Sequence, residues 1–221
     1  DAKDLTQEYF ATFLEKEYIL EYIDRLAACK MNVLHLHLTD DQGWRIEIKK
    51  HPELTGICSQ FSPQYPNEVG GFYTQDDVRE IVAYAAKNFI TVVPEIEMPG
   101  HSSEIFAAFP QLSCSGQTAV IYPYVLGPPV TTQILCAGND SVFAFLEDVL
   151  GEVIDLFPSG YIHIGGDEAP KTAWQNCPKC QSRIRTERLT NEAGLQSWFI
   201  RRIELFVNSK GRKIIGWDDI V

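Results

Sequence analysis

The sequence lacks several features that mark common functional classes. No apolar run is long enough to cross a membrane as a helix, so no membrane span is expected. Basic residues are few: 19 Lys and Arg stand against 30 Asp and Glu, and the net charge of −11 argues against nucleic acid as a partner. No internal repeat or low-complexity tract is visible. No signal peptide is visible either, although a processed first residue would hide one.

The composition is that of an ordinary globular protein. The 221 residues suffice for one large domain or two small ones, and 45% of them are hydrophobic and 22% charged. We treat residues 1–221 as a single domain.

Apolar periodicity predicts helices and strands in alternation. Helices are expected over residues 17–30, 74–87, 103–109, 141–156 and 192–208, and strands over residues 33–38, 89–95, 161–164 and 213–216. Long polar connections are expected over residues 51–73, 110–139 and 169–189. This order implies an α/β fold with a parallel sheet. Because no Gly-rich phosphate loop follows a strand, a dinucleotide-binding sheet is disfavoured.

Polar residues that suit chemistry follow each of the four predicted strands. They are Asp40 and Asp41, Glu97 and His101, Asp167 and Glu168, and Trp217 and Asp218. The carboxyl ends of the strands carry the active site in TIM barrels, so this placement favours a (β/α)8 barrel. A barrel needs eight strands, and the sequence therefore predicts part of one.

The adjacent carboxylates Asp167 and Glu168 follow two glycines at the end of an apolar strand. Neighbours within a strand point to opposite faces, but Gly165 and Gly166 free the backbone to turn and let both side chains reach one site. Two close carboxylates do not ionise independently, which suits general acid catalysis. A solvated acid pair, or acids at the start of a helix, is the alternative interpretation.

Histidines and tryptophans supply further candidates. His101 lies in an exit loop, and a chain of Asp40, His101 and Glu168 would tune the proton affinity of Glu168. Trp44 and Trp217 are candidates to stack on a sugar, with ordinary packing as the alternative. His35 and His37 share one face of a strand, and packed, hydrogen-bonded histidines are favoured over metal ligands there.

Six cysteines occur, at positions 29, 58, 114, 136, 177 and 180. Cys177 and Cys180 have the spacing of half a zinc site or of a redox pair. Because no second such pair and no nearby His completes it, thiols or a local disulfide are favoured over zinc. Cys114 and Cys136 flank a loop that a disulfide would close. No metal ligand and no cofactor is assigned.

Four segments, in order, resemble those of the family 20 glycoside hydrolases, the β-N-acetylhexosaminidases. They are residues 34–45 (LHLHLTDDQGWR), 93–102 (VPEIEMPGHS), 163–168 (HIGGDE) and 216–219 (GWDD), which resemble segments at the family's second to fifth barrel strands. The similarity runs from about Glu17 to the C-terminus.

The resemblance implies a retaining hydrolase that removes terminal β-linked N-acetylhexosamine, so an N-acetylhexosamine-containing glycan is the expected partner. In this family the 2-acetamido oxygen of the substrate attacks the anomeric carbon, an exception to the two-carboxylate scheme. Glu168 would be the acid and base, and Asp167 would orient the acetamido group. Asp40 and His101 would form a relay to Glu168. The resemblance also implies that the substrate is bound by Trp217, Trp198, Glu97 and Asp218.

Two departures from the family pattern matter. The Arg that clamps the terminal sugar in the family falls near Ala11, and residues 1–13 contain no Arg. The sequence also ends just after the fifth-strand segment. We therefore expect a partial catalytic barrel that requires the remaining strands.

Other functional classes stay open. The missing Arg and strands favour an inactive or carbohydrate-binding fragment of the same family, whereas the intact Asp167 and Glu168 favour the enzyme. A metal-dependent barrel hydrolase would use His35 and His37 as ligands.

Overall fold

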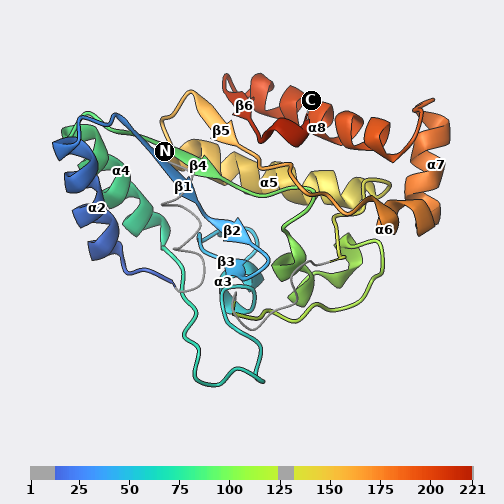
Figure 1. Cartoon of the computed structure of the whole chain (residues 1–221), viewed down its shortest axis with the longest axis horizontal. Helices are drawn as coiled ribbons and strands as arrows, with labels where there is room; N and C mark the ends of the chain where they lie inside the picture. Colours follow the sequence, from blue (N-terminus) through green and yellow to red (C-terminus); the bar gives the residue numbers. More distant parts are fainter. Residues whose placement is uncertain (1–12, 124–131, 221) are drawn as a thin grey trace.

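Four parallel strands form the main sheet. The computed structural model describes residues 13–123 and 132–220. The strands pair in this order (Figure 1): β1 (Val33–His37), β4 (Thr91–Glu95), β5 (Tyr161–His163) and β6 (Lys213–Ile215). Every pairing is parallel, and Glu95 of β4 lies opposite His163 of β5. The parallel sheet predicted from the alternation of helices and strands is thereby confirmed.

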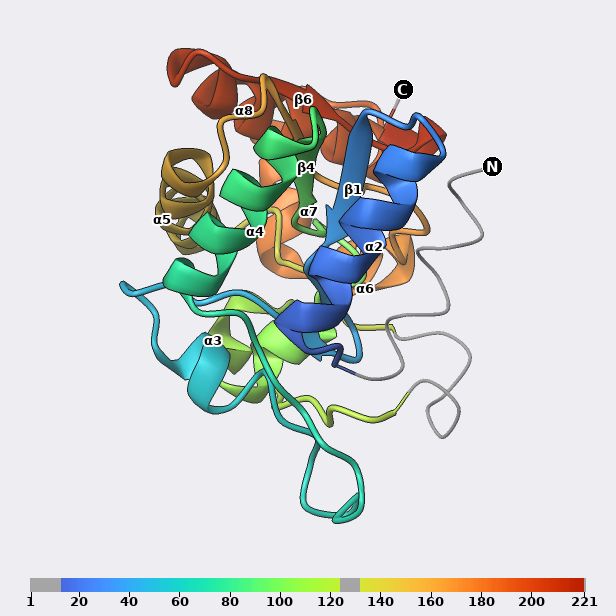
Figure 2. The same ribbon diagram turned by 90° about the vertical axis from the view of Figure 1, so that its left-hand side faces the viewer.

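Four helices form one layer beside the sheet (Figure 2). They are α2 (Lys16–Ala28), α4 (Gln75–Lys87), α5 (Asp140–Leu156) and α8 (Glu192–Ser209). Each helix contacts the next one in this order. A single helix layer outside parallel strands is the architecture of part of a (β/α)8 barrel.

The helix boundaries follow from local chemistry. Thr74 caps α4, because its hydroxyl accepts a hydrogen bond from the Asp77 backbone N–H while the Asp77 carboxylate accepts one from the Thr74 N–H. Asn191 caps α8 through a hydrogen bond from the Gly194 N–H to its side chain. The start predicted for the helix over residues 74–87 is therefore set by the capping residues.

The two faces of the sheet differ in character. Side chains alternate along a strand, so Leu34 and Leu36 of β1 are buried toward the helices, whereas His35 and His37 point to the other side. The core between sheet and helices is made of aliphatic and aromatic side chains, such as Ile23, Ile81, Leu146, Val149, Phe199 and Ile203. Each such buried side chain contributes roughly 1.5–3 kcal/mol. The polar residues of the strands face the opposite side, where the candidate site lies.

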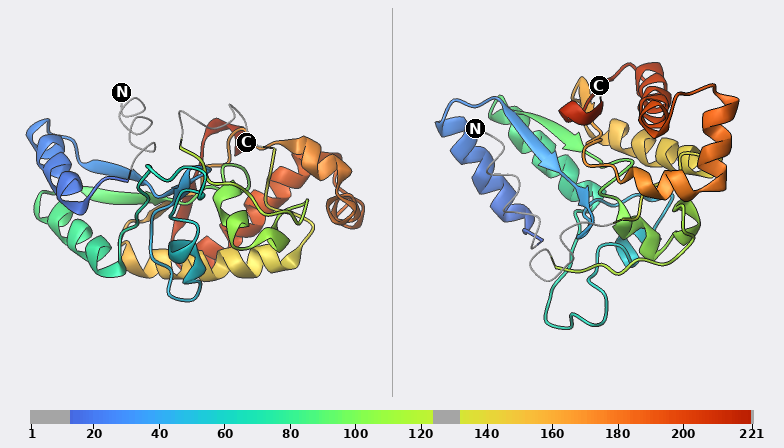
Figure 3. Two further views of the ribbon diagram at one scale, coloured as in Figure 1. Left: turned by 90° about the horizontal axis from the view of Figure 1, so that it is seen from below. Right: turned by 45° about the vertical axis from the view of Figure 1, so that its right-hand side comes forward.

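The predicted polar connections contain more regular structure than expected. Residues 169–189 hold α6 (Lys171–Asn176) and α7 (Pro178–Thr186), which lie beside α8 (Figure 3). Residues 51–73 hold α3 (Glu53–Gly56), and β2 (Thr39–Asp40) pairs with β3 (Gly43–Trp44). These elements are too short to show a clear apolar periodicity in the sequence. Trp174 and Cys180 nevertheless anchor α6 and α7 in the interior.

Three 3₁₀ helices complete the elements discussed below. They are η1 (Ser103–Ala107), η2 (Pro110–Leu112) and η4 (Asp218–Ile220). Within residues 13–123 and 132–220, no helix has both the length and the apolar character that a membrane crossing requires.

Candidate active site

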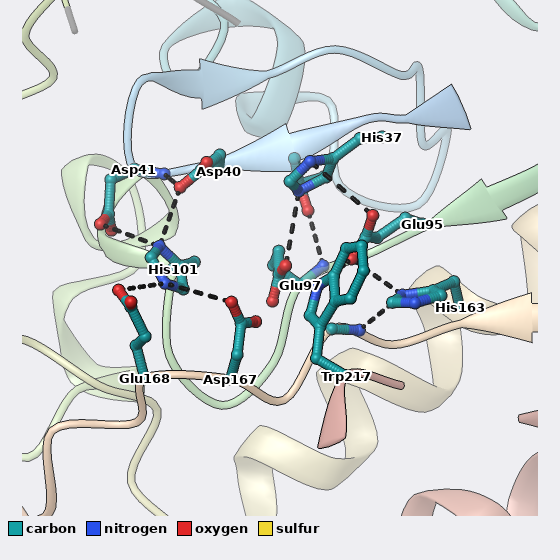
Figure 4. A network of polar contacts seen from close by, with 12 residues as sticks. His37, Asp40, Asp41, Glu95, Glu97, His101, His163, Asp167, Glu168 and Trp217 are labelled. Carbon is teal, nitrogen blue, oxygen red and sulfur yellow. Dashed lines mark hydrogen bonds and ion pairs between the residues drawn. The ribbon is translucent and has the colours of Figure 1, made fainter. Parts of the chain in front are cut away.

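His101 lies between two pairs of carboxylates (Figure 4). Its Nδ1 is 3.2 Å from Asp40 Oδ1 and 3.6 Å from Asp41 Oδ2. Its Nε2 is 3.6 Å from Glu168 Oε2 and 4.0 Å from Asp167 Oδ2. Three segments that are far apart in sequence therefore meet at one imidazole: the β2–β3 hairpin, the loop after β4 and the loop after β5.

The loop after β5 turns sharply at its glycines. Gly165 has φ +64° and Gly166 has φ +98°, in the left-handed region that other residues seldom adopt. A Cβ at Gly165 would lie 1.7 Å from Glu97 Oε2, so only glycine fits beside that carboxyl group. Gln196 of α8 fixes the turn by donating a hydrogen bond to the Gly166 carbonyl at 2.8 Å. This turn carries Asp167 and Glu168 to the same site.

The environment of His101 and Asp167 shifts their pKa values in the same direction. Hydrogen bonds to Asp40 and Asp41 raise the pKa of His101 to about 12, so the imidazole is protonated at neutral pH. Burial raises the pKa of Asp167, and His101 opposes that rise. Asp167 Oδ1 is buried and accepts no hydrogen bond from the residues that the structure describes. An acceptor of this kind is suited to a donor on a bound ligand.

Glu168 differs from Asp167 in its exposure. Its side chain is 74% exposed, against 30% for Asp167, and its backbone N–H donates a hydrogen bond to Asp219 Oδ2. The backbone of Glu168 has φ +46°, which is uncommon for a non-glycine residue. Asp219 thus holds the backbone while the carboxyl group stays open to solvent.

A second network lies next to the first and is centred on Glu95. The Glu95 carboxylate lies 2.6 Å from His35 Nε2 and 2.8 Å from His163 Nδ1. The Trp217 indole N–H donates to Glu95 Oε1 at 3.1 Å. Burial opposes ionisation of Glu95, but the hydrogen bonds from His163 and His35 prevail and lower its pKa. The network thereby fixes the Trp217 ring, which packs 4.8 Å from the His163 ring.

The pKa of Glu97 is shifted in the opposite direction from that of Glu95. It is buried, and its Oε1 lies 3.5 Å from His37 Nε2. Burial raises its pKa well above the ordinary range, and the charges of Glu95 and Asp167 raise it further. The raised pKa favours the protonated form of Glu97, whose carboxyl group lies directly against the Gly165 turn.

His35 and His37 do not converge on a common point. His35 groups with Glu95 and His163, whereas His37 groups with Glu95 and Glu97, and the two ring centroids are 6.5 Å apart. This geometry favours the packed, hydrogen-bonded histidines of the sequence interpretation over a His35–His37 metal pair. Each group does present three ligand-type side chains, but the Glu95 carboxylate is shared between them.

Several predicted site residues lie elsewhere. Trp198 packs between outer helices: its ring is 5.4 Å from Phe143 of α5, and Arg183 of α7 stacks on it at 4.8 Å. These contacts place Trp198 beside the outer helices, and its role in a sugar pocket stays a prediction. Trp44 is fully buried in the core and donates its N–H to the Ile46 carbonyl, so it does not form the rim.

Asp218 lies in the exposed η4, and its neighbour Asp219 makes the contact with Glu168. The position near Ala11, where the family has its clamping Arg, lies outside the described residues.

The sequence interpretation also missed the roles of Glu95, His163 and Asp219. A polar residue at every second position of an apolar strand, as at His35 and His37, is the signal that indicates the Glu95 network.

Comparison of the sequence with known protein families gives one match that covers almost the whole chain. The pattern of "Glycosyl hydrolase family 20, catalytic domain" matches residues 11–221. The chain belongs to glycosyl hydrolase family 20. A β-hexosaminidase from Porphyromonas gingivalis is 48% identical over 213 residues, which cover 95% of this chain and 26% of that protein.

Solved family 20 structures have the same fold. A β-N-acetylhexosaminidase from Bacteroides fragilis superposes with a TM-score of 0.83 at 45% identity, over 95% of this chain and 40% of the other. An exo-β-N-acetylglucosaminidase from Vibrio harveyi, in complex with N-acetylglucosamine, gives 0.84 at 33% identity, over 95% and 34%. These relatives are TIM-barrel enzymes, and the chain matches about a quarter to two fifths of the length of the three.

Proposed function

We propose that the protein containing this chain is a retaining hydrolase that removes terminal β-linked N-acetylhexosamine by substrate-assisted catalysis. The observation that carries the proposal is the contact of one imidazole, His101, with Asp40 and Asp41 on one nitrogen and with Asp167 and Glu168 on the other. Membership of family 20, with relatives named β-hexosaminidases, supports the substrate class.

Glu168 is proposed as the general acid and base. Its carboxyl group is largely exposed and is therefore open to a substrate, unlike the buried Glu95 and Glu97. It would protonate the departing glycosidic oxygen and then take a proton from the attacking water. His101, held by Asp40, is a positioning residue for this carboxyl group.

Asp167 is proposed to orient the 2-acetamido group. Its unpartnered Oδ1 is an acceptor for the acetamido N–H. The acetamido oxygen would attack the anomeric carbon as the glycosidic bond breaks, and the positive charge on the resulting oxazolinium nitrogen would favour ionised Asp167. The pKa of Asp167 is raised in the free protein, and the positive charge that develops during the reaction would lower it.

Trp217 is proposed as the aromatic wall of the acetamido pocket. Its N–H is fixed by Glu95, and its ring contacts His163 and His35, so its orientation is set before a ligand binds. Glu97 would support the loop after β5, because its carboxyl group lies against Gly165. Asp218 is the remaining proposed sugar contact. The remaining barrel strands are proposed to complete the site.

The test compares two aryl glycosides on an extended chain. The extended chain is residues 1–221 followed by the segment that comes after the matching region in the Porphyromonas gingivalis relative. We expect cleavage of the aryl N-acetyl-β-glucosaminide and little cleavage of the matching 2-hydroxy glucoside, because only the former carries the internal nucleophile. A thiazoline mimic of the cyclised intermediate should inhibit strongly.

Efficient cleavage of the 2-hydroxy glucoside would contradict substrate assistance. Binding of N-acetylglucosamine without cleavage of either glycoside would instead assign a carbohydrate-binding role.

A further inference from the structure

Four cysteines that are far apart in sequence meet at one point, away from the His101 carboxylates. Cys114 follows η2, and Cys136 precedes α5. Cys177 comes directly before α7, and Cys180 lies in its first turn. All four sulfur atoms lie within 4.8 Å of one another. The sequence offers no second pair of this spacing and no nearby His, but the fold brings Cys114 and Cys136 from another loop to Cys177 and Cys180.

The sulfur separations match a tetrahedral metal cage. Cys136 Sγ lies 3.7 Å from the sulfurs of both Cys177 and Cys180, and Cys114 Sγ lies 3.7 Å from that of Cys180. Four sulfurs at about 2.3 Å from a central zinc would stand about 3.8 Å apart. Two disulfides would bring the sulfurs together only in pairs, at about 2.0 Å, and would not require all four to meet.

The surroundings suit thiolate ligands. Three of the four cysteines are buried, and Cys114 is partly buried. Cys177 is the N-cap residue of α7 and Cys180 lies in its first turn, where the helix dipole favours negative charge.

Gly138 explains how the loop that carries Cys136 comes so close to the Cys177–Cys180 turn. A Cβ at this position would lie 2.2 Å from the Lys179 carbonyl carbon and 2.4 Å from the Cys180 nitrogen. A residue with a side chain would therefore push the Cys136 loop away from the Cys177–Cys180 turn. The glycine permits the backbone contact that a four-sulfur site needs.

We propose that Cys114, Cys136, Cys177 and Cys180 bind a structural zinc ion. Four thiolates fill the tetrahedral coordination of zinc and leave no open position, which is typical of structural sites. Binding would release the thiol protons to solvent. No redox step is involved, and zinc binding does not require the proposed hydrolase activity.

The zinc would join the loop before α5 to the α6–α7 segment. Leu135, next to Cys136, donates its N–H to the Pro99 carbonyl at 3.0 Å and accepts a hydrogen bond from the Trp174 indole at 3.0 Å. Pro99 is two residues from His101, so the zinc site would brace the loop that holds this imidazole.

The experiment measures metal in the full 221-residue chain and in the extended chain, both purified under reducing conditions without chelator. Elemental analysis should give one zinc ion per chain. Cys177→Ser and Cys180→Ser should lose most of the zinc, whereas Cys29→Ser, which removes an exposed thiol outside the cluster, should keep it.

If the cysteine variants fail to fold, measurements on the unsubstituted chain still test the zinc site. X-ray absorption at the zinc edge should give four sulfur neighbours at about 2.3 Å, and cobalt substitution should give the absorption of tetrahedral thiolate coordination. Zinc absent from the folded chain, four thiols freely alkylated in it, or two disulfides in the intact mass would overturn the proposal. Iron in place of zinc would overturn the choice of metal.

Discussion

The charge on His101 is set by side chains from three loops. Asp40 and Asp41 contact one nitrogen, and Asp167 and Glu168 approach the other, so the imidazolium form neutralises part of a four-carboxylate cluster. Removing any one of these residues changes the balance for the others, since all lie within a few ångströms in a partly buried place.

Glu168→Gln should lower the turnover of the extended chain by roughly 10²–10⁴-fold on a substrate with a poor leaving group, because the proposed general acid and base is lost. An activated aryl leaving group needs less protonation, so its cleavage step should suffer less. Steady-state kinetics with both substrates measure the difference. Glu204→Gln, on the exposed side of α8, is the control. Equal losses on both substrates would argue against the assigned role.

His101→Gln should flatten the dependence of stability on alkaline pH. The pKa of His101 is raised to about 12, so its pairing stabilises the fold fully below the unfolded value of about 6.5 and this stabilisation is lost as the pH rises toward the folded value. Urea unfolding of the extended chain at several values between about pH 6.5 and pH 10 measures the free energy. Parallel pH profiles for the two proteins would contradict the raised pKa.

At the level of elements, the turn after β5 depends on a glycine that contacts a carboxyl group from another strand end. Residue 165 must be glycine for two reasons: its φ is positive, and the Glu97 carboxyl group occupies the space where a Cβ would lie. The strand, the turn and the buried Glu97 therefore form one unit, and the turn in turn places Asp167 and Glu168. Strain introduced here should reach Asp167 and Glu168 directly.

Gly165→Ala should destabilise the extended chain by at least about 1–3 kcal/mol, the usual cost of a strained backbone conformation, with the Glu97 clash added to it. Activity should fall as well, because Asp167 and Glu168 move with the turn. Gly151→Ala is the matched control, since it lies in α5 and its added Cβ meets no atom within 4 Å. Thermal or urea unfolding compares the two. A Gly165→Ala protein as stable and active as the Gly151→Ala protein would refute the account of the turn.

At the scale of the whole molecule, the described sheet has two open edges. β1 pairs only with β4, and β6 pairs only with β5, within the part of the chain that the structure describes. Closed barrels give every strand two neighbours, and unpaired edges present free backbone groups to other chains. The inner, polar face of the sheet likewise faces no opposite wall among the described strands.

Residues 1–221 alone should therefore self-associate and show little hydrolase activity, although they contain Asp167 and Glu168. The extended chain should be monomeric, should unfold cooperatively and should turn over substrate. Size-exclusion chromatography and thermal unfolding of both proteins test this. A monomeric 221-residue chain with full activity would show that the open edges do not matter.

Much of the fold could be predicted because its causes are local. Thr74 and Asp77 cap a helix through their own backbone neighbours, and the apolar periodicity of residues 141–156 needs no distant partner. The carboxyl ends of parallel strands share one edge, so the meeting of Asp40, His101 and Asp167 also followed from the strand order. These features depend on sequence spacing alone.

Other features were decided only by packing. The helix over residues 192–208 has apolar side chains on more than one face, and only the contacts with Phe143 and Arg183 direct Trp198 away from the site. Cys114 and Cys180 are 66 positions apart, so no local spacing indicates their contact. The pKa values of Glu95 and Glu97 differ because burial and neighbouring charges differ, and both depend on tertiary structure.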